Sequence, residues 1–112
     1  MMTIVDFNIL ITFDLNYASS SDYKSINAYL EGKGIEPLSQ KGYKLPSNTY
    51  IGKKSEVVGR LETELEVAKK IKNNIFAGLK RNISMTVVSS VVFVMVTPAH
   101  STSYSCSKPI DA

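Results

Sequence analysis

The fold is decided by residues 3–15, which read TIVDFNILITFDL. One face of this stretch carries large apolar side chains: Phe7, Ile9, Ile11 and Phe13. The other face is mixed: Asp6, Asn8, Leu10, Thr12 and Asp14. Apolar side chains that recur every two residues indicate a β-strand. The pattern therefore predicts a strand over about residues 5–15, in a sheet that is covered by helices on one side only.

The composition is that of an ordinary globular protein. The chain has 112 residues, of which 44% are hydrophobic and 21% are charged, and this fits a single domain. Cys106 is the only cysteine, which excludes an intrachain disulfide and favours a reducing compartment. The N-terminus lacks the basic region of a signal peptide, and the most apolar segment, residues 85–96, is too short to span a bilayer. We therefore expect a cytoplasmic protein with no membrane partner.

A first helix follows the strand. Serines at positions 19–21 suit the cap of a helix, and Asp22 suits its first turn. The helix is expected to end at Gly32 and Gly34. The serines could instead bind a phosphate at the helix N-terminus. Residues 35–54 have room for two short strands at most, the second including residues 49–51.

A second helix is predicted from Ser55, taken as its cap, to Leu79. The apolar stripe that supports it includes Val57, Val58, Leu61, Leu65 and Ala68. A helix of this length would run about 38 Å, longer than the strands it must cover. We therefore expect a break near Asn73 and Asn74, with one long helix as the alternative.

The last strand is predicted over residues 83–96. Both of its faces are apolar over residues 91–96, so it is expected either in the centre of the sheet or with one face against a partner chain. Pro98 ends it. Residues 99–112 are small and polar and are expected to form a loosely ordered tail, which leaves residues 1–98 as the folded domain.

This order of elements, β-α-β-β-α-β, predicts the α+β class. It is the order of the ferredoxin-like split βαβ unit, in which an antiparallel sheet has its helices on one face.

Residues 8–15, with Phe13 and Asp14 near their end, resemble the first strand of the CRISPR-associated spacer-acquisition endoribonucleases. The virulence-associated protein D toxins and the GhoS antitoxin, itself an endoribonuclease, are similar small ferredoxin-like proteins. The middle of this chain is most similar to GhoS, which also has a Phe-Asp pair followed by serines, a tyrosine and a helix, and later a segment like residues 45–51. The layout resembles these proteins over residues 5–96, but the motif is shared only around Phe13 and Asp14.

The resemblance implies that Asp14 is a catalytic residue and a metal ligand. In the CRISPR-associated family an aspartate at this position is implicated in metal binding at a dimer interface. Mg²⁺ prefers oxygen ligands and keeps several waters, so one carboxylate from each of two chains could hold it. No second acid lies close to Asp14 in the sequence, so catalysis would require a homodimer. Alternatively, Asp14 is structural and caps the turn that follows the strand.

Aromatic and basic residues could bind single-stranded RNA, since tyrosines stack on bases and lysines neutralise phosphates. The candidates are Tyr17, Lys41, Lys44, Tyr50, Lys53, Lys69 and Lys70. The alternative is that they are ordinary surface residues that keep the edge strands soluble. His100 and Cys106 lie in the expected tail without a catalytic partner, so neither is predicted to be functional.

The first functional hypothesis is a dimeric RNA-binding protein, with Mg²⁺-dependent endoribonuclease activity of the toxin–antitoxin or CRISPR-associated type. The alternative is a non-enzymatic dimeric module that binds a partner protein or inhibits an enzyme.

Overall fold

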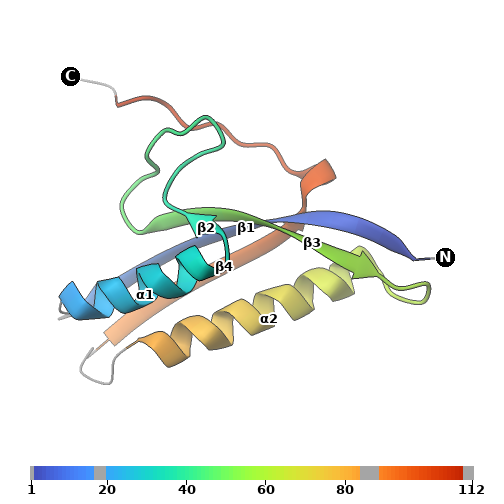
Figure 1. Cartoon of the computed structure of the whole chain (residues 1–112), viewed down its shortest axis with the longest axis horizontal. Helices are drawn as coiled ribbons and strands as arrows, with labels where there is room; N and C mark the ends of the chain where they lie inside the picture. Colours follow the sequence, from blue (N-terminus) through green and yellow to red (C-terminus); the bar gives the residue numbers. More distant parts are fainter. Residues whose placement is uncertain (1, 17–19, 84–88, 110–112) are drawn as a thin grey trace.

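The computed structural model describes residues 2–16, 20–83 and 89–109. Its elements follow the order β-α-β-β-α-β, ending in a short 3₁₀ helix (Figure 1). They are β1 (Thr3–Asn16), α1 (Ser20–Gly32), β2 (Ile35–Glu36), β3 (Thr49–Val58), α2 (Glu64–Asn82), β4 (Ser89–Pro98) and η1 (Ala99–Ser101).

The four strands form one sheet in the order β2-β3-β1-β4, and every neighbouring pair is antiparallel. β1 and β2 therefore run parallel to each other with β3 between them, and β3 and β4 run parallel with β1 between them. Both helices lie against the same face of the sheet (Figure 1). The predicted α+β class and the antiparallel sheet with two helices are confirmed.

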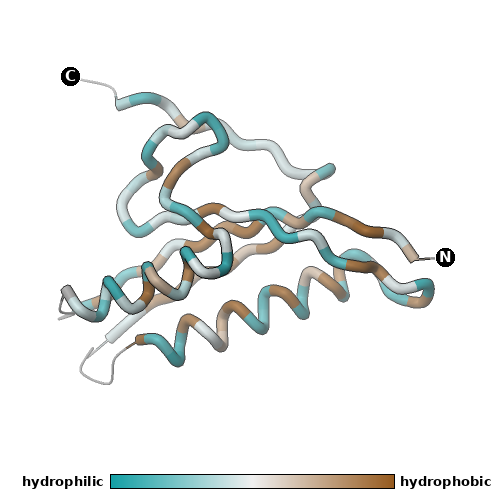
Figure 2. The backbone as a smooth tube through the Cα atoms, in the orientation of Figure 1, coloured by the Kyte–Doolittle hydropathy of each residue, from teal (hydrophilic) through white to brown (hydrophobic). Residues whose placement is uncertain are grey.

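The core forms where β1 faces the two helices. Phe7, Ile9, Ile11 and Phe13 are at most 4% exposed, as the alternation predicts. The helices contribute a matching set of buried residues: Ile26, Leu30, Val67, Ala68, Ile71, Ile75 and Leu79. Figure 2 shows how apolar and polar residues alternate along both helices. The helices therefore bury one apolar stripe each and turn their polar sides to water.

The predicted start of the second helix is wrong. β3 continues to Val58, and Ser55 lies on this strand opposite Asp6, to which its hydroxyl donates a hydrogen bond. The helix begins at Glu64, and the Thr63 side chain caps it by accepting from the Glu66 backbone N–H at 3.1 Å. The later start removes the excess length, so no break is needed at Asn73 and Asn74, and α2 is continuous.

The central position predicted for the last strand is also wrong, because β4 is an edge strand. Its inner residues Val92, Val94 and Val96 pack against the core, which accounts for one of its two apolar faces. Ile83, predicted at the start of this strand, is the C-cap of α2 instead. Residues 84–88 lie outside the described part of the chain.

The tail segment, which we define as residues 99–109, turns back across the uncovered side of the sheet (Figure 1). At its start, His100 Nε2 lies 2.5 Å from Glu64 Oε1 at the beginning of α2. Further on, the backbone N–H of Gln40, in the loop between β2 and β3, donates to Tyr104 Oη at 3.1 Å. The tail segment thus connects the start of α2 with the loop between β2 and β3.

Candidate interaction surface

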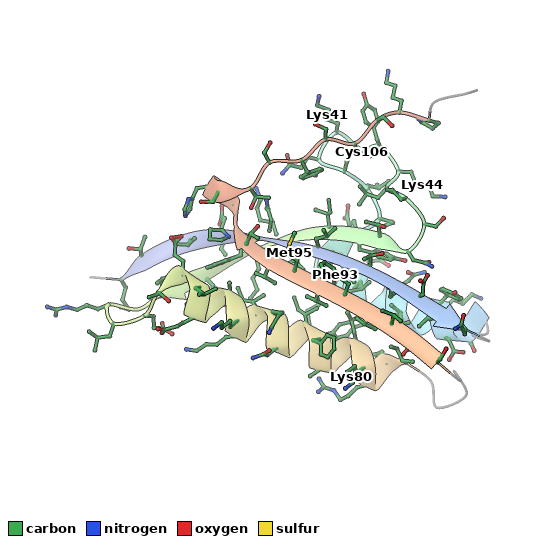
Figure 3. The ribbon with its side chains drawn as sticks, turned by 180° about the vertical axis from the view of Figure 1, so that it is seen from behind. Lys41, Lys44, Lys80, Phe93, Met95 and Cys106 are labelled. Atoms are coloured by element: carbon green, nitrogen blue, oxygen red, sulfur yellow. The ribbon has the colours of Figure 1, made fainter. Side chains whose placement is uncertain are left out.

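The face of the sheet that carries no helix, called here the outer face, presents an apolar row along β4. Val91, Phe93 and Met95 are 69%, 50% and 41% exposed. In the register between β1 and β4 they lie opposite Asp14, Thr12 and Leu10, respectively. Figure 3 labels Phe93 and Met95 along β4. Large apolar side chains gathered in this way mark an interaction site on a protein surface.

The two edges of the sheet differ in how they are protected. β2 has only two residues, ends in a glutamate and is followed by Pro37, and each of these features discourages another strand from pairing. β4 has ten residues, none of them charged, and its only proline is the last residue. Its outer backbone groups have no partner strand in the described part of the chain. The β4 edge is therefore open to pairing.

Asp14 lies on the outer face near the end of β1 and is exposed. No hydrogen bond or ion pair to its carboxylate is found among residues 2–16, 20–83 and 89–109. Within the same residues, no group of three or more His, Cys, Asp or Glu side chains could hold a metal ion. Among the described residues, Asp14 therefore belongs to no such group, and in the homodimer predicted from the sequence a second chain would supply the further ligand.

Tyr50 does not fit the RNA-stacking role that the sequence predicts for it, because its ring lies in the core. The residue is 8% exposed, and its ring stacks on Phe13 with centroids 5.7 Å apart. Its hydroxyl donates a hydrogen bond to Asn27 Oδ1 on α1. Burial raises the pKa of the Tyr50 hydroxyl. Tyr17, the other predicted stacking residue, lies outside the described residues.

The predicted basic residues fall into two groups on opposite sides of the sheet. Lys41, Lys44 and Lys53 form the group on the outer side, and Lys69 and Lys70 form the group on the helical side (Figure 3). Lys53 projects from the outer face of β3, opposite Asn8. Lys41 and Lys44 lie in the loop between β2 and β3, beside Cys106 of the tail segment (Figure 3). Lys69 and Lys70 are exposed on α2, in the helical layer on the other side of the sheet. A single strand of RNA would have to pass around the domain to contact both groups.

Lys70 already has a carboxylate partner. Its Nζ lies 2.5 Å from Glu62 Oε2, and Glu62 Oε1 accepts the Gly59 backbone N–H at 2.9 Å. The hydrogen bond to Lys70, followed by the one from Gly59, lowers the pKa of Glu62, while the same pair raises the pKa of Lys70. Lys70 therefore stabilises the turn before α2 through Glu62. It is a weaker candidate than Lys69 for binding a phosphate of RNA.

The tail segment makes contacts that the sequence does not predict. His100 is paired with Glu64, and its Nδ1 lies 3.0 Å from Ser101 Oγ. The Cys106 thiol lies 3.8 Å from the Lys44 carbonyl oxygen. The two partners of the His100 contact are 36 residues apart, so no local pattern could indicate it.

No family model, curated protein or solved structure matches this chain. In the part of the chain that the structure describes, neither helix is long and apolar enough to cross a membrane.

Proposed function

We propose that this chain is a ferredoxin-like, non-enzymatic interaction module that forms a homodimer by pairing the β4 edges of two copies. The ferredoxin-like assignment is supported by the element order and by the sheet order β2-β3-β1-β4, in which each βαβ unit is split by a third strand. The single observation that carries the dimer is the long, uncharged β4 edge with its exposed row of Val91, Phe93 and Met95.

A second copy suits this edge because the row is complementary to itself. In an antiparallel pair centred on Phe93, the two Phe93 side chains meet, and Val91 of each copy faces Met95 of the other. No like charges oppose each other, since β4 has no charged residue. Such a pair has two-fold symmetry and extends each sheet by main-chain hydrogen bonds. It also removes the open edge that would otherwise favour aggregation.

Sedimentation equilibrium tests the dimer, with Phe93→Lys as the disruptive variant and Leu38→Lys as its matched control. Both side chains are large, apolar and exposed, at 50% and 42%, but Leu38 follows β2, at the opposite edge of the sheet from β4. We expect dimers for the wild type and Leu38→Lys, and folded monomers for Phe93→Lys. A monomeric wild type, or a dimeric Phe93→Lys, would contradict the proposal.

Metal-dependent RNA cleavage is the second candidate, and it is favoured by the exposed carboxylate of Asp14, which has no hydrogen-bond or ion-pair partner among the described residues. Strands in a sheet are about 4.8 Å apart and rise about 3.4 Å per residue, so three spacings across the sheet and four residues along it would separate the Asp14 residues of this edge-paired dimer by about 20 Å. Oxygens that share one Mg²⁺ each lie about 2.1 Å from it. Cleavage at a shared metal therefore needs a different dimer, in which the outer faces pack together, with Lys41, Lys44 and Lys53 holding the RNA backbone.

Incubation of the protein with RNA and Mg²⁺ separates the two candidates. Cleavage that is lost in Asp14→Ala while the fold is retained would favour the enzyme. Absence of cleavage by the wild type, or equal cleavage by the variant, would exclude a catalytic role for Asp14.

A further inference from the structure

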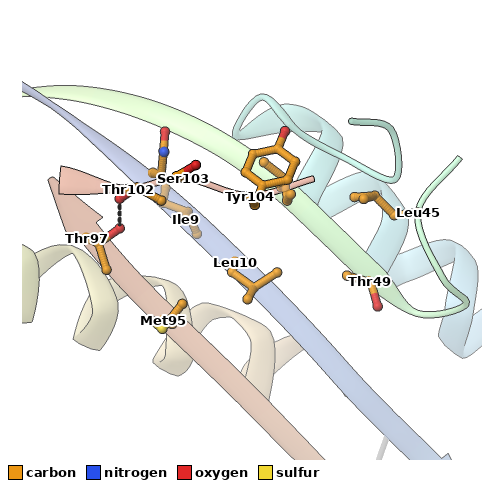
Figure 4. Close-up of a pocket in the computed structure, with 11 residues that line it drawn as sticks. Ile9, Leu10, Leu45, Thr49, Met95, Thr97, Thr102, Ser103 and Tyr104 are labelled. Carbon is orange, nitrogen blue, oxygen red and sulfur yellow. Dashed lines mark hydrogen bonds between the residues drawn. The ribbon is translucent and has the colours of Figure 1, made fainter. Parts of the chain in front are cut away.

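A pocket with a volume of about 230 Å³ lies between the outer face and the tail segment. Leu10, Ile51 and Met95 line it from three adjacent strands, β1, β3 and β4. Thr102, Ser103 and Tyr104 line it from the tail segment. Figure 4 shows Met95, Leu10 and Tyr104 around this space. The sheet thus forms the floor of the pocket and the tail segment crosses above it.

The tail segment is fixed on both sides of the pocket. On one side, the hydroxyls of Thr97 and Thr102 are hydrogen bonded, and Thr102 Oγ1 also donates to the Pro98 carbonyl oxygen at 2.8 Å (Figure 4). On the other side, Tyr104 Oη accepts the backbone N–H of Gln40. These attachments hold the segment across the sheet without filling the space beneath it.

The lining indicates the class of ligand. None of the described residues that line the pocket is charged. Asn8, Thr49 and Ser103 add a few neutral hydrogen-bonding groups to the apolar surface. A dry cavity of roughly 150 Å³ is enough for benzene, so this pocket can hold a larger ring system. Apolar pockets with a few polar groups are typical small-molecule sites.

We infer that this pocket binds an uncharged, largely apolar small molecule, of about the size of two or three aromatic rings, between the sheet and the Tyr104 ring. The inference does not depend on the proposed dimer, because the pocket lies over β1 and β3 as well as β4 and is complete within one chain.

Titration with N-phenylnaphthylamine, an uncharged probe that fluoresces in apolar surroundings, tests the inference. We expect saturable binding of one probe molecule per chain to the wild type. Leu10→Trp should abolish binding by filling the pocket, and Tyr104→Ala should weaken it by about tenfold because one wall is lost. Val57→Ser is the control, since Val57 is exposed on the outer face of β3 but neither lines the pocket nor belongs to the β4 row. Phe93→Ser tests separately whether the probe binds the β4 row instead. Circular dichroism checks the fold of each variant.

Retained binding in Val57→Ser and Phe93→Ser together with loss in Leu10→Trp would support the inference. It would be overturned by a wild type without saturable binding, or by folded Leu10→Trp and Tyr104→Ala that bind like the wild type. Loss of binding in Phe93→Ser alone would also overturn it, because the probe would then occupy the exposed β4 row. If Leu10→Trp does not fold, Tyr104→Ala decides.

Discussion

Asp14 lies directly opposite Val91 across the β1–β4 pairing, so the exposed acid of the outer face borders the most exposed residue of the β4 row. Val91 carries no charge that could stabilise the Asp14 carboxylate. The two residues therefore support different functions: Asp14 supports a metal site shared between two outer faces, and Val91 supports a dimer paired along the β4 edge.

Replacement of Asp14 by asparagine tests which of these roles applies. If β4 forms the dimer, Asp14→Asn should leave self-association unchanged and alter the free energy of unfolding by no more than about 0.5 kcal/mol. Mg²⁺ should then raise the melting temperature of neither protein. A Mg²⁺-dependent rise in the wild type that is absent from Asp14→Asn would instead reveal a metal site.

The hydrogen bond from Tyr50 to Asn27 should contribute measurably to stability, because it joins β3 to α1 at the edge of the core. We expect Tyr50→Phe to lower the free energy of unfolding by about 1 kcal/mol. In denaturant titrations, a cycle with Asn27→Ala should give less than additive losses. Fully additive losses would show that the two side chains do not interact in solution.

Burial should also make Tyr50 ionise later than exposed tyrosines. Its pKa in the folded protein is raised above the ordinary value of 10.0, because burial disfavours the tyrosinate form. The contribution of Tyr50 to the free energy of unfolding is therefore fully present below that pH and is lost as the pH rises through the raised pKa. Absorbance titration of tyrosinate should show a late step that is missing in Tyr50→Phe. Identical titration curves would contradict the buried position of the ring.

Gly78 lets α2 approach α1 closely at Tyr29. A Cβ at this position would lie 1.8 Å from Tyr29 Oη and 2.4 Å from its ring carbon Cζ. Gly78→Ala should therefore destabilise the wild type by about 1–2 kcal/mol, although alanine is the better helix former. In a Tyr29→Ala background the same change should stabilise by about 0.5–1 kcal/mol. Thermal unfolding of the four proteins measures this reversal, and the same sign in both backgrounds would refute it.

Regular alternation made β1 and its buried face predictable from the sequence, since Phe7, Ile9, Ile11 and Phe13 all face the helices. The region around Val57 and Val58 was ambiguous, because adjacent apolar residues fit either the end of a strand or the start of a helical stripe. Ser55 suits a helix cap by type, but the pairing of β3 with β1 places it in a strand. Tertiary pairing decided this segment, and a local pattern does not contain that information.

The candidate surface was only partly predictable, for a related reason. Apolar residues on both faces of β4 fit a central strand as well as an edge strand that meets a partner. Only the strand order separates these alternatives. Tyrosine is a residue type that stacks on bases, so its presence at position 50 does not reveal whether the ring is exposed. The pairing of Tyr50 with Ile11, whose side chain faces the core, places the ring in the core. The pocket depends on tail contacts such as Tyr104 with Gln40, which are 64 residues apart.

The Glu62–Lys70 pair should make stability depend on pH at the turn before α2. The folded pKa of Glu62 lies below its ordinary value of 4.5, so its contribution is present above that pH and is lost as the pH falls through the lowered pKa. Denaturant titrations at a series of acidic pH values should show this loss in the wild type. The Glu62→Gln variant should not lose stability in this way as the pH falls. The control is Glu31→Gln, which replaces an exposed glutamate on α1 and should lose stability like the wild type. Parallel acid profiles for the wild type and Glu62→Gln would mean that the pair does not persist in solution, and Lys70 would then be available to bind phosphate on the helical side.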